Sequence, residues 1–334
     1  MKVACIGAGS WGTAVARLLA LNGHVTWLWA HSESTAGYIN EHHKNPRYLV
    51  DCELPQNIIA TSHLKDCLDA ANALVFVVPS AHLRSVAQEC SQFVRENIPA
   101  VVLTKGIENK TGKLMIDVVL DELPTCKEIA CLSGPNHAEE VSRDLPSAAV
   151  VACKDPDRAI FFRDLFHAES FRVYVSDDPI GVEICAAAKN VIAIACGISR
   201  GFGTGDNTAA LLMTRGLAEM SRLVNAYGGK AITCMGLAGM GDLIATCTSS
   251  HSRNAAFGRA FAEGESLEHY CERTHMVVEG ALACISIREA AKKLNVDVPI
   301  ADAVWNLLYG GFSFDDVFES LVQRTPKDEF YGLA

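Results

Sequence analysis

Two polar residues interrupt the longest apolar stretch of this 334-residue chain. Lys189 and Asn190 lie inside Ile184–Ile198, where the other residues are apolar or small. A lysine is almost never fully buried without a partner, and it usually extends along apolar neighbours until its ammonium group reaches water. Apolar residues lie on every side of Lys189, so an exposed face for it is hard to find, although a surface lysine remains the alternative. Desolvation lowers the pKa of a lysine, which suits a general acid or base, and we predict a catalytic Lys189.

A second lysine stands where an open sheet would present it to a ligand. Lys105 comes two residues after the end of the predicted strand Ala100–Leu103. The carboxyl ends of strands in open α/β sheets face the ligand crevice. We predict that Lys105 binds a carbonyl oxygen or a phosphate, and a solvated loop lysine is the alternative.

A third group of polar residues surrounds the start of two predicted helices. Asp242 precedes an apolar run, and Ser252, Arg253 and Asn254 open a helix over Ala255–Ala262. Hydroxyl, guanidinium and amide groups beside the N–H groups of a helix start suit a phosphate, and arginine can hold two phosphate oxygens. The alternatives are a helix cap at Asp242 and a capped surface helix at Ser252.

A glycine-rich turn near the amino terminus predicts a dinucleotide site. Gly7, Gly9 and Gly12 follow the pattern G-x-G-x-x-G between the predicted strand Val3–Ile6 and a helix with Trp11 and Val15 on its apolar face. The first glycine permits the tight turn, the second lets a pyrophosphate approach, and the third lets helix and strand pack closely. A plain strand–helix turn is the alternative.

The end of the second predicted strand bears on the choice of cofactor. NAD sites usually carry an Asp or Glu there for the ribose 2′-hydroxyl. Here His24–Trp29 is followed by Ala30, His31 and Ser32, with Glu33 near the tip but not at it. Because His31 and Ser32 would not repel a 2′-phosphate, we predict NADP or dual use of NAD and NADP. A solvated loop role for His31 is the alternative.

The elements around these residues predict two domains. Short β-branched runs alternate with helical patterns up to Ser176, which indicates crossover units and a largely parallel sheet. Beyond Pro179 only helical stripes are visible, such as Met213, Leu217, Met220 and Val224, and the residues from Thr325 are expected to be loose. We predict an α/β domain over residues 1–178 and an all-helical domain over residues 179–330. The remaining predicted strands are Asn57–Ala60, Ala73–Val78, Ile129–Leu132, Ala148–Ala152 and Phe171–Val175.

Composition narrows the classes of partner. The net charge of −10 argues against nonspecific binding of nucleic acid or of an anionic membrane surface. Ile184–Ile198 is shorter than the about 20 residues that a membrane span needs. The 13 cysteines form no C-x-x-C pair, so we expect no disulfide framework and no metal site, and a reducing, cytoplasmic location.

Taken together, these segments resemble the bacterial-type NAD(P)-dependent glycerol-3-phosphate dehydrogenases. The resemblance runs in the family's order from residue 7 to residue 280. Its segments are GAGSWGTA, TKGIE, LSGPNHAEEV, AAKNVIAIACGI, TRGLAEMSRL, GLAGMGDLIATCTSSHSRN and VVEG. It implies a Rossmann-like doubly wound sheet followed by an all-helical domain. It also implies hydride transfer between NAD(P)H and dihydroxyacetone phosphate, which gives sn-glycerol 3-phosphate for glycerophospholipid synthesis, and it is compatible with a homodimer.

The resemblance assigns roles residue by residue. Lys189 corresponds to the general acid/base, and Lys105 to a residue that touches substrate and cofactor and polarises the carbonyl. The other substrate contacts implied are Gly134, Asn136, Asp242, Ser252, Arg253 and Asn254. The cofactor contacts implied are Ser10, Trp11, His31, Lys105, Ala138, Arg253, Val277 and Glu279, together with the three glycines of the turn. At Asn136 the family usually has Ser or Thr, which changes the geometry of that contact.

Two other functions remain open. A related dehydrogenase with this architecture would act on a 3-hydroxy acid or a ketopantoate-like substrate, and the phosphate-binding pattern at Ser252–Asn254 argues against it. A catalytically silent NAD(P)-binding sensor would keep cofactor binding and show no turnover, with or without Lys189.

Overall fold

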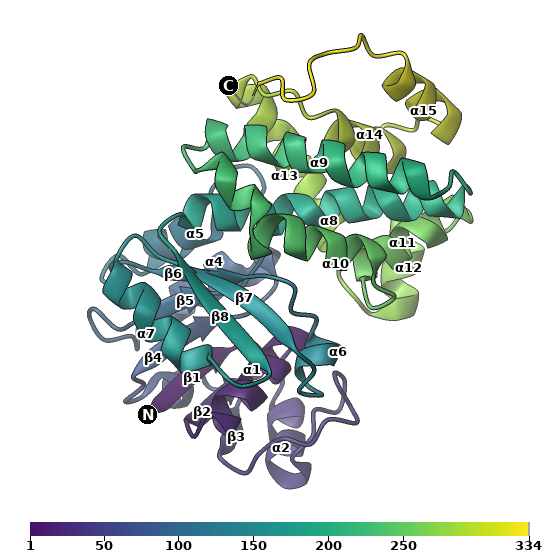
Figure 1. Ribbon diagram of the computed structural model, residues 1–334. Coiled ribbons are helices and arrows are strands. Elements are labelled where there is room, and N and C mark those ends of the chain that lie inside the picture. The colour runs from purple at the N-terminus through teal and green to yellow at the C-terminus, as the bar shows by residue number, and fades with distance from the viewer. Residues whose placement is uncertain (333–334) are drawn as a thin grey trace. The chain divides into compact units, whose positions relative to one another are not determined.

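The computed structural model describes residues 1–332, which form two compact units (Figure 1). Unit 1 consists of residues 1–105 and 115–179, and unit 2 begins with residues 106–114 and continues from Ile180. The sequence placed residues 106–114 in the first domain. Instead they form a small loop closed by an antiparallel bridge between Ile107 and Leu114, and the Ser286 hydroxyl in unit 2 donates a 3.0 Å hydrogen bond to the Ile107 carbonyl.

Unit 1 is built on one eight-stranded sheet in the order β3-β2-β1-β4-β5-β6-β7-β8. The first six strands are parallel and have the order of a doubly wound dinucleotide-binding fold, which confirms the predicted Rossmann-like architecture. The strands are β1 (Lys2–Ile6), β2 (Val25–Trp29), β3 (Ile58–Thr61), β4 (Ala73–Phe76), β5 (Ala100–Val102), β6 (Ala130–Ser133), β7 (Ser147–Ala152) and β8 (Phe171–Ser176).

All eight predicted strands are present, with ends shifted by one or two residues. The prediction did not foresee that β7 runs antiparallel to β6, with Leu132 opposite Val151. Strand β4 is buried along its whole length, since Ala73, Leu74, Val75 and Phe76 each have 0% exposure. That burial explains why the strand is an uninterrupted apolar run rather than an alternating one.

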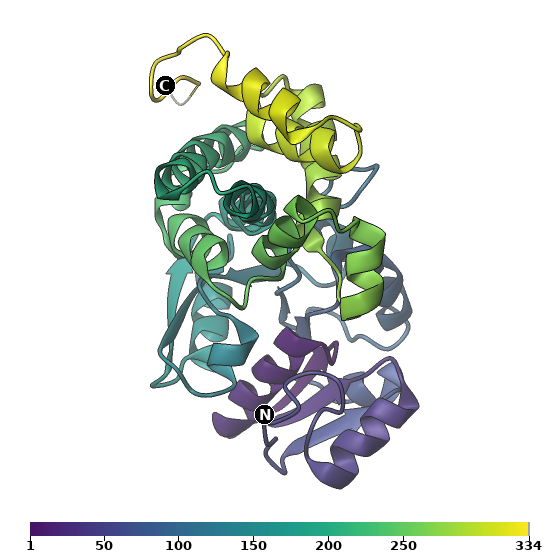
Figure 2. The same ribbon diagram turned by 90° about the vertical axis from the view of Figure 1, so that its right-hand side faces the viewer.

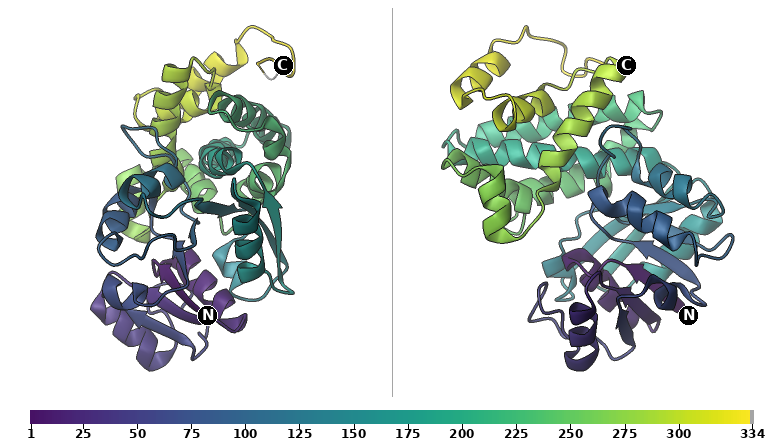
Figure 3. Two further views of the ribbon diagram at one scale, coloured as in Figure 1. Left: turned by 90° about the vertical axis from the view of Figure 1, so that its left-hand side faces the viewer. Right: turned by 180° about the vertical axis from the view of Figure 1, so that it is seen from behind.

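Helices cover both faces of the sheet (Figure 3). Right-handed crossovers that move in opposite directions from β1 and β4 must place their helices on opposite faces. Accordingly α1 contacts α6 and α7, whereas α4 contacts α3 and α5. These helices of unit 1 are α1 (Ser10–Leu21), α2 (Glu33–His42), α3 (Leu64–Leu68), α4 (Ser80–Cys90), α5 (Met115–Glu122), α6 (Ala138–Val141) and α7 (Pro156–Phe166).

Unit 2 is helical around α8 (Pro179–Gly201), which lies in the middle of the unit and is seen nearly end-on in Figure 2. This helix is longer than the predicted apolar stretch. Its 23 residues and mean hydropathy of 1.6 would suffice to cross a membrane by length and composition, but 89% of its apolar window is buried within the structure. The other elements are α9 (Asp206–Ala226), η1 (Ala231–Met235), η2 (Leu237–Gly241), α10 (Asp242–Thr248), α11 (Arg253–Ala262), α12 (Leu267–Thr274), α13 (Glu279–Leu294), α14 (Pro299–Leu308) and α15 (Phe314–Val322).

The end of the described chain is more ordered than its polar sequence suggested. The Asp297 carboxylate accepts hydrogen bonds from Arg324 at 2.6 Å, Lys327 at 2.9 Å and Tyr331 at 3.1 Å. Long-range pairing of this kind leaves no periodic pattern, so the expectation of a loose end from Thr325 is wrong for these residues.

Candidate functional site

Lys189 is buried in unit 2 and has two polar partners. Its side chain is 5% exposed. The Nζ atom donates to Asp242 Oδ1 at 2.6 Å and to Thr246 Oγ1 at 2.9 Å. The alternative of a lysine that extends to the surface is therefore wrong. Asp242 stabilises the charged ammonium, an effect that the sequence argument from desolvation alone did not include.

The local fold of α10 explains how Lys189 gains both partners. Asp242 and Thr246 are four residues apart, so they lie on the same face of the helix. The Thr246 hydroxyl also lies 3.3 Å from Asp242 Oδ1. The α10 cap position is occupied by Gly241, and the buried Asp242 side chain turns to Lys189, so the capping alternative is wrong.

A turn of π-helix leads into α10 and brings it close to its neighbours. A Cβ at Gly239, within this turn, would lie 2.1 Å from the Cys234 carbonyl oxygen. Only glycine permits that approach. Single π-helical turns often occur at functional sites. The run Gly239-Met240-Gly241 thus fixes where α10 starts, and with it the position of Asp242.

A chain of amide groups lies next to Lys189 in the sequence. Asn254 Nδ2 donates to Asn190 Oδ1 at 3.0 Å, and the Gly280 amide donates to Asn254 Oδ1 at 3.0 Å. The Gly280 backbone lies so close to α8 that a Cβ would be 2.5 Å from the Asn190 carbonyl oxygen. Asn254 therefore connects α8, α11 and the start of α13, a structural role that its sequence pattern did not reveal.

The three residues predicted to hold a phosphate differ in exposure. Ser252 caps α11, because its Oγ accepts from the Ala255 amide at 3.2 Å. Ser252 and Asn254 are 3% and 8% exposed, so the capped start of this helix is buried on both sides of Arg253. Arg253 is exposed, as is Val277, while Glu279 is half-buried at the first position of α13.

In unit 1 the glycine-rich turn has the three properties predicted for it. Gly7 has a φ of +126°, and a Cβ there would lie 3.0 Å from the Val77 backbone. A Cβ at Gly12 would lie 1.9 Å from the Gly7 oxygen. A Cβ at Gly9 would meet nothing within 4 Å, and Gly9 caps α1 without a side-chain hydrogen bond. The open space at Gly9, and a helix start whose N–H groups receive no side-chain cap, fit a bound pyrophosphate.

The surroundings of the turn also match a dinucleotide site. The order of the sheet reverses between β1 and β4, which is where ligands bind in such sheets. Trp11 Nε1 is buried and has no hydrogen-bond partner, Ser10 Oγ lies 3.5 Å from Glu139 Oε1, and Ala138 is buried at the start of α6. Beyond β2, His31 is exposed, and no acid stands at the tip because Glu33 begins α2.

Lys105 meets another predicted site residue within unit 1. Strands β5 and β6 are parallel neighbours, so the loops after them leave the sheet side by side. Lys105 Nζ donates to Asn136 Oδ1 at 3.4 Å. Gly134, which precedes this asparagine by two residues, has a φ of +154° and packs against Ala148.

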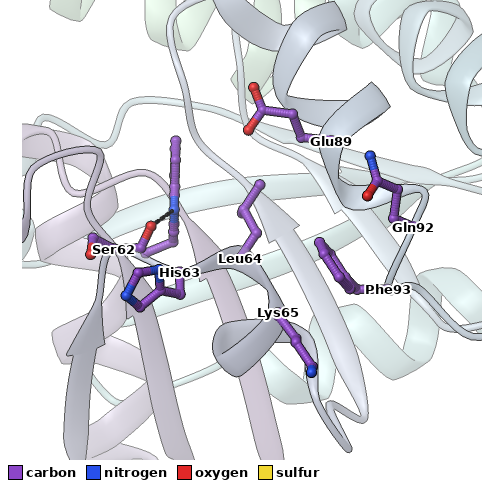
Figure 4. A pocket seen from close by; sticks show the side chains of 8 residues that line it. Ser62, His63, Leu64, Lys65, Glu89, Gln92 and Phe93 are labelled. Carbon is purple, nitrogen blue, oxygen red and sulfur yellow. Dashed lines mark hydrogen bonds between the residues drawn. The ribbon is translucent and has the colours of Figure 1, made fainter.

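A separate hollow of about 320 Å³ opens in unit 1 (Figure 4). It contains none of the residues that the sequence predicts for cofactor or substrate. Trp29 belongs to its lining and donates from Nε1 to the Ser62 carbonyl at 3.0 Å. The lining residues are Trp29, Ser62, His63, Leu64, Lys65, Glu89, Gln92 and Phe93. This hollow is not the candidate site.

Sequence reasoning missed Thr246 and the pairing of Asn190. The i, i+4 spacing of Asp242 and Thr246 was a signal that could have identified the threonine. Within residues 1–332, no cluster of three or more His, Cys, Asp or Glu side chains is suited to hold a metal ion.

Comparisons with known proteins agree on one family. A family profile described as NAD-dependent glycerol-3-phosphate dehydrogenase N-terminus matches residues 2–159, and the C-terminal profile of the same family matches residues 178–319. Relatives named glycerol-3-phosphate dehydrogenase (NAD(P)+) include one from Oceanobacillus iheyensis, 42% identical, with 100% of this chain and 97% of the relative covered. Another, from Bacillus cereus, is 43% identical, with 99% and 98% covered.

Solved structures give the same result. The glycerol-3-phosphate dehydrogenase of Coxiella burnetii is 35% identical, with a TM-score of 0.92 over 97% of this chain and 99% of that chain. A ketopantoate reductase from Ralstonia eutropha has a TM-score of 0.61 at 17% identity, over 97% of this chain and 100% of that chain, which shows a shared fold alone.

Proposed function

This chain belongs to the NAD-dependent glycerol-3-phosphate dehydrogenase family, and from that premise we propose that it reduces dihydroxyacetone phosphate to sn-glycerol 3-phosphate reversibly. It is an oxidoreductase that uses NAD or NADP. The bound nicotinamide supplies or accepts the hydride. The observation that carries the proposal is the buried group of Lys189, Asp242 and Thr246, because it holds an ammonium ion where water is excluded.

Lys189 is the general acid of the reduction and the general base of the oxidation. Its ammonium gives a proton to the substrate oxygen as the ketone becomes an alcohol, and its amine takes that proton back in the reverse direction. Asp242 and Thr246 hold Nζ in one position, which removes the rotational freedom of a long side chain before substrate binds. Asp242 also belongs to the proposed substrate-binding set.

Lys105 polarises the carbonyl. Its ammonium group stands at the carboxyl end of the parallel sheet, where substrates and cofactors of doubly wound folds bind. A fixed positive charge beside an oxygen that becomes more negative during hydride transfer lowers the barrier, because the charge need not be reorganised. Gly134 and Asn136, on the loop after β6, complete this part of the substrate site.

The phosphate of the substrate is held at the start of α11. Ser252 already caps the helix, and Asn254 already bonds to Asn190. Their backbone groups and the side-chain hydrogen bonds still open to them therefore shape the site, while Arg253 supplies the positive charge. An exposed guanidinium beside a helix start suits a dianionic phosphate in a chain whose net charge is −10. Binding energy at the phosphate then orients the reacting carbon.

The cofactor lies along the glycine-rich turn of unit 1. Gly7, Gly9 and Gly12 admit the pyrophosphate to the start of α1. The missing acid after β2 favours NADP, or use of both cofactors, because no carboxylate there repels a 2′-phosphate. The remaining contacts proposed are Ser10, Trp11, His31, Lys105, Ala138, Arg253, Val277 and Glu279.

The proposed function also implies a role for each domain, a use for the product and a location in the cell. The dinucleotide-binding domain corresponds to unit 1, residues 1–105 and 115–179, and the substrate domain corresponds to unit 2. The product serves as a precursor of glycerophospholipids. None of the thirteen cysteines forms a disulfide within residues 1–332, which suits a reducing cytoplasm.

The test follows nicotinamide absorbance with each cofactor and with dihydroxyacetone phosphate, dihydroxyacetone or ketopantoate. Turnover with the phosphorylated ketone, at a kcat/KM at least about 100-fold above the others, is expected because only it carries a dianionic phosphate for the cationic helix start. Equal or greater turnover with ketopantoate would instead support the related dehydrogenase.

A lysine variant separates catalysis from cofactor binding. Lys189→Met should reduce kcat by about 10²–10⁴-fold while the Kd of NADPH stays within about twofold. Lys292→Met, an exposed lysine on α13, is the matched control and should retain full activity. No turnover by the parent enzyme with any ketone would favour the silent sensor.

A further inference from the structure

The side-chain amide of Asn136 has a hydrogen-bond partner at its oxygen but none at its nitrogen. The residue is 6% exposed. Its Oδ1 accepts from Lys105 Nζ at 3.4 Å, whereas its Nδ2 is buried and has no hydrogen-bond partner. A buried amide N–H without an acceptor is unfavourable, and native proteins rarely retain one without a reason. A ligand that accepts from Nδ2 on binding would provide that reason.

The backbone on both sides of this contact is fixed by the sheet. A Cβ at Gly134 would lie 2.6 Å from the Ala148 carbonyl oxygen and 2.7 Å from Ala149 Cα, so the loop after β6 cannot shift toward β7. On the other side, Thr104 is buried and its Oγ1 donates to the Val78 carbonyl at 2.7 Å. The loops that carry Lys105 and Asn136 are thus each tied to a neighbouring strand or loop.

The chemistry of the two groups defines the ligand atom. Lysine offers only donors, so the amide must present its oxygen to Nζ and turn its NH₂ group away. The result is two donors, Lys105 Nζ and Asn136 Nδ2, carried by adjacent loops at the same edge of the sheet. Such a pair suits one oxygen that carries partial or full negative charge.

From this geometry we propose that Asn136 positions Lys105 through Oδ1 and donates from Nδ2 to the same substrate oxygen that Lys105 polarises. The proposal rests on the proposed function and deepens it, because it assigns a two-donor site to the oxygen on the carbon that gains the hydride. A serine or threonine hydroxyl at position 136 must accept and donate through one oxygen on a shorter side chain, whereas the carboxamide separates the acceptor Oδ1 from the donor Nδ2.

The test replaces the donor and keeps the acceptor. Asn136→Asp has nearly the same shape and retains an oxygen for Lys105 Nζ, but it presents a second oxygen in place of Nδ2. Removal of one such donor typically lowers kcat by about 10²–10³-fold. We expect that loss in kcat with dihydroxyacetone phosphate, with the Kd of NADPH within about twofold, since Asn136 is not among the proposed cofactor contacts and Lys105 keeps an oxygen partner. Asn225→Asp on the exposed part of α9 is the control and should behave as the parent.

Two outcomes overturn the inference. A fall in kcat of less than about tenfold means that Nδ2 does not donate in the transition state. A loss of NADPH binding or of thermal stability that matches the loss of kcat means that Asn136 is merely structural. Asn136→Ala removes both groups without the negative charge that aspartate adds beside Lys105, and it should also lose at least about 10²-fold in kcat.

Failure of this inference is distinguishable from failure of the proposed function. The parent enzyme is assayed first with dihydroxyacetone phosphate. If it shows no turnover, the proposed function is refuted, and the inference with it. If it does and Asn136→Asp retains kcat, only the role of Asn136 is refuted.

Discussion

The ion pair of Lys189 and Asp242 allows stability and catalysis to be measured separately. Both side chains are almost fully buried, at 5% and 3% exposure, and their charged atoms lie 2.6 Å apart. Removal of one partner leaves an uncompensated buried charge, which costs about 3–5 kcal/mol in other proteins. Replacement of both partners by apolar residues of similar volume is often close to neutral.

We therefore expect Lys189→Met and Asp242→Leu each to lower the free energy of unfolding of the helical unit by about 3–5 kcal/mol. The double variant should lie within about 1 kcal/mol of the parent, so the coupling energy of the cycle should be at least about 5 kcal/mol. A loss of that size is a large share of the about 5–15 kcal/mol that stabilises a typical domain. Urea unfolding followed by circular dichroism gives the stability, and nicotinamide absorbance gives kcat.

The double variant is decisive because it restores the fold without the ammonium group. It should be nearly as stable as the parent and as inactive as Lys189→Met. Recovery of kcat in the double variant would show that Lys189 is not the proton donor. Single variants within about 0.5 kcal/mol of the parent would show that the pair is not desolvated, and the argument from burial would then be wrong.

Two further predictions concern the cofactor turn and a second buried carboxyl. Gly9→Ala should leave the melting temperature unchanged, since its Cβ meets no atom, yet it should weaken the binding of NADPH at least about tenfold in a fluorescence titration. Gly12→Ala should instead unfold the turn, because its Cβ would lie 1.9 Å from a carbonyl oxygen. Burial raises the pKa of Glu219 from 4.5 to about 7, although two amides at the start of α14 stabilise its charge. Its contribution to stability is thus fully present below about pH 4.5 and is lost as pH rises through about 7, by about 3 kcal/mol in all. Urea unfolding at pH 5 and 7.5 measures the change in the free energy of unfolding with pH, and Glu219→Gln should make that change smaller. Glu289→Gln, on the surface of α13, is the control and should retain it. An unchanged dependence on pH in Glu219→Gln would refute the assignment.

Much of the fold could be predicted because the responsible signals are local. Strands buried on both faces must be apolar throughout, so runs such as Ala73–Phe76 identify themselves. The antiparallel direction of β7 depends on how the chain returns after β6, and no local pattern records that direction. The same holds for residues 106–114, whose place in unit 2 follows from contacts such as the Tyr227 hydroxyl to the Gly112 carbonyl at 3.2 Å.

The two lysines show which parts of a site a sequence can reveal. Lys189 was visible because a charge inside an apolar helix demands a partner, but the identity of that partner came only from the fold, which brings α10 against α8. Lys105 was visible only from its place after a strand, and no local pattern showed its partner Asn136, which lies 31 residues away on the loop after the next strand. A charged residue inside an otherwise apolar stretch therefore predicts that a site exists. The atoms that complete the site, such as Thr246 Oγ1 and Asn136 Oδ1, belong to elements whose meeting is decided by tertiary packing.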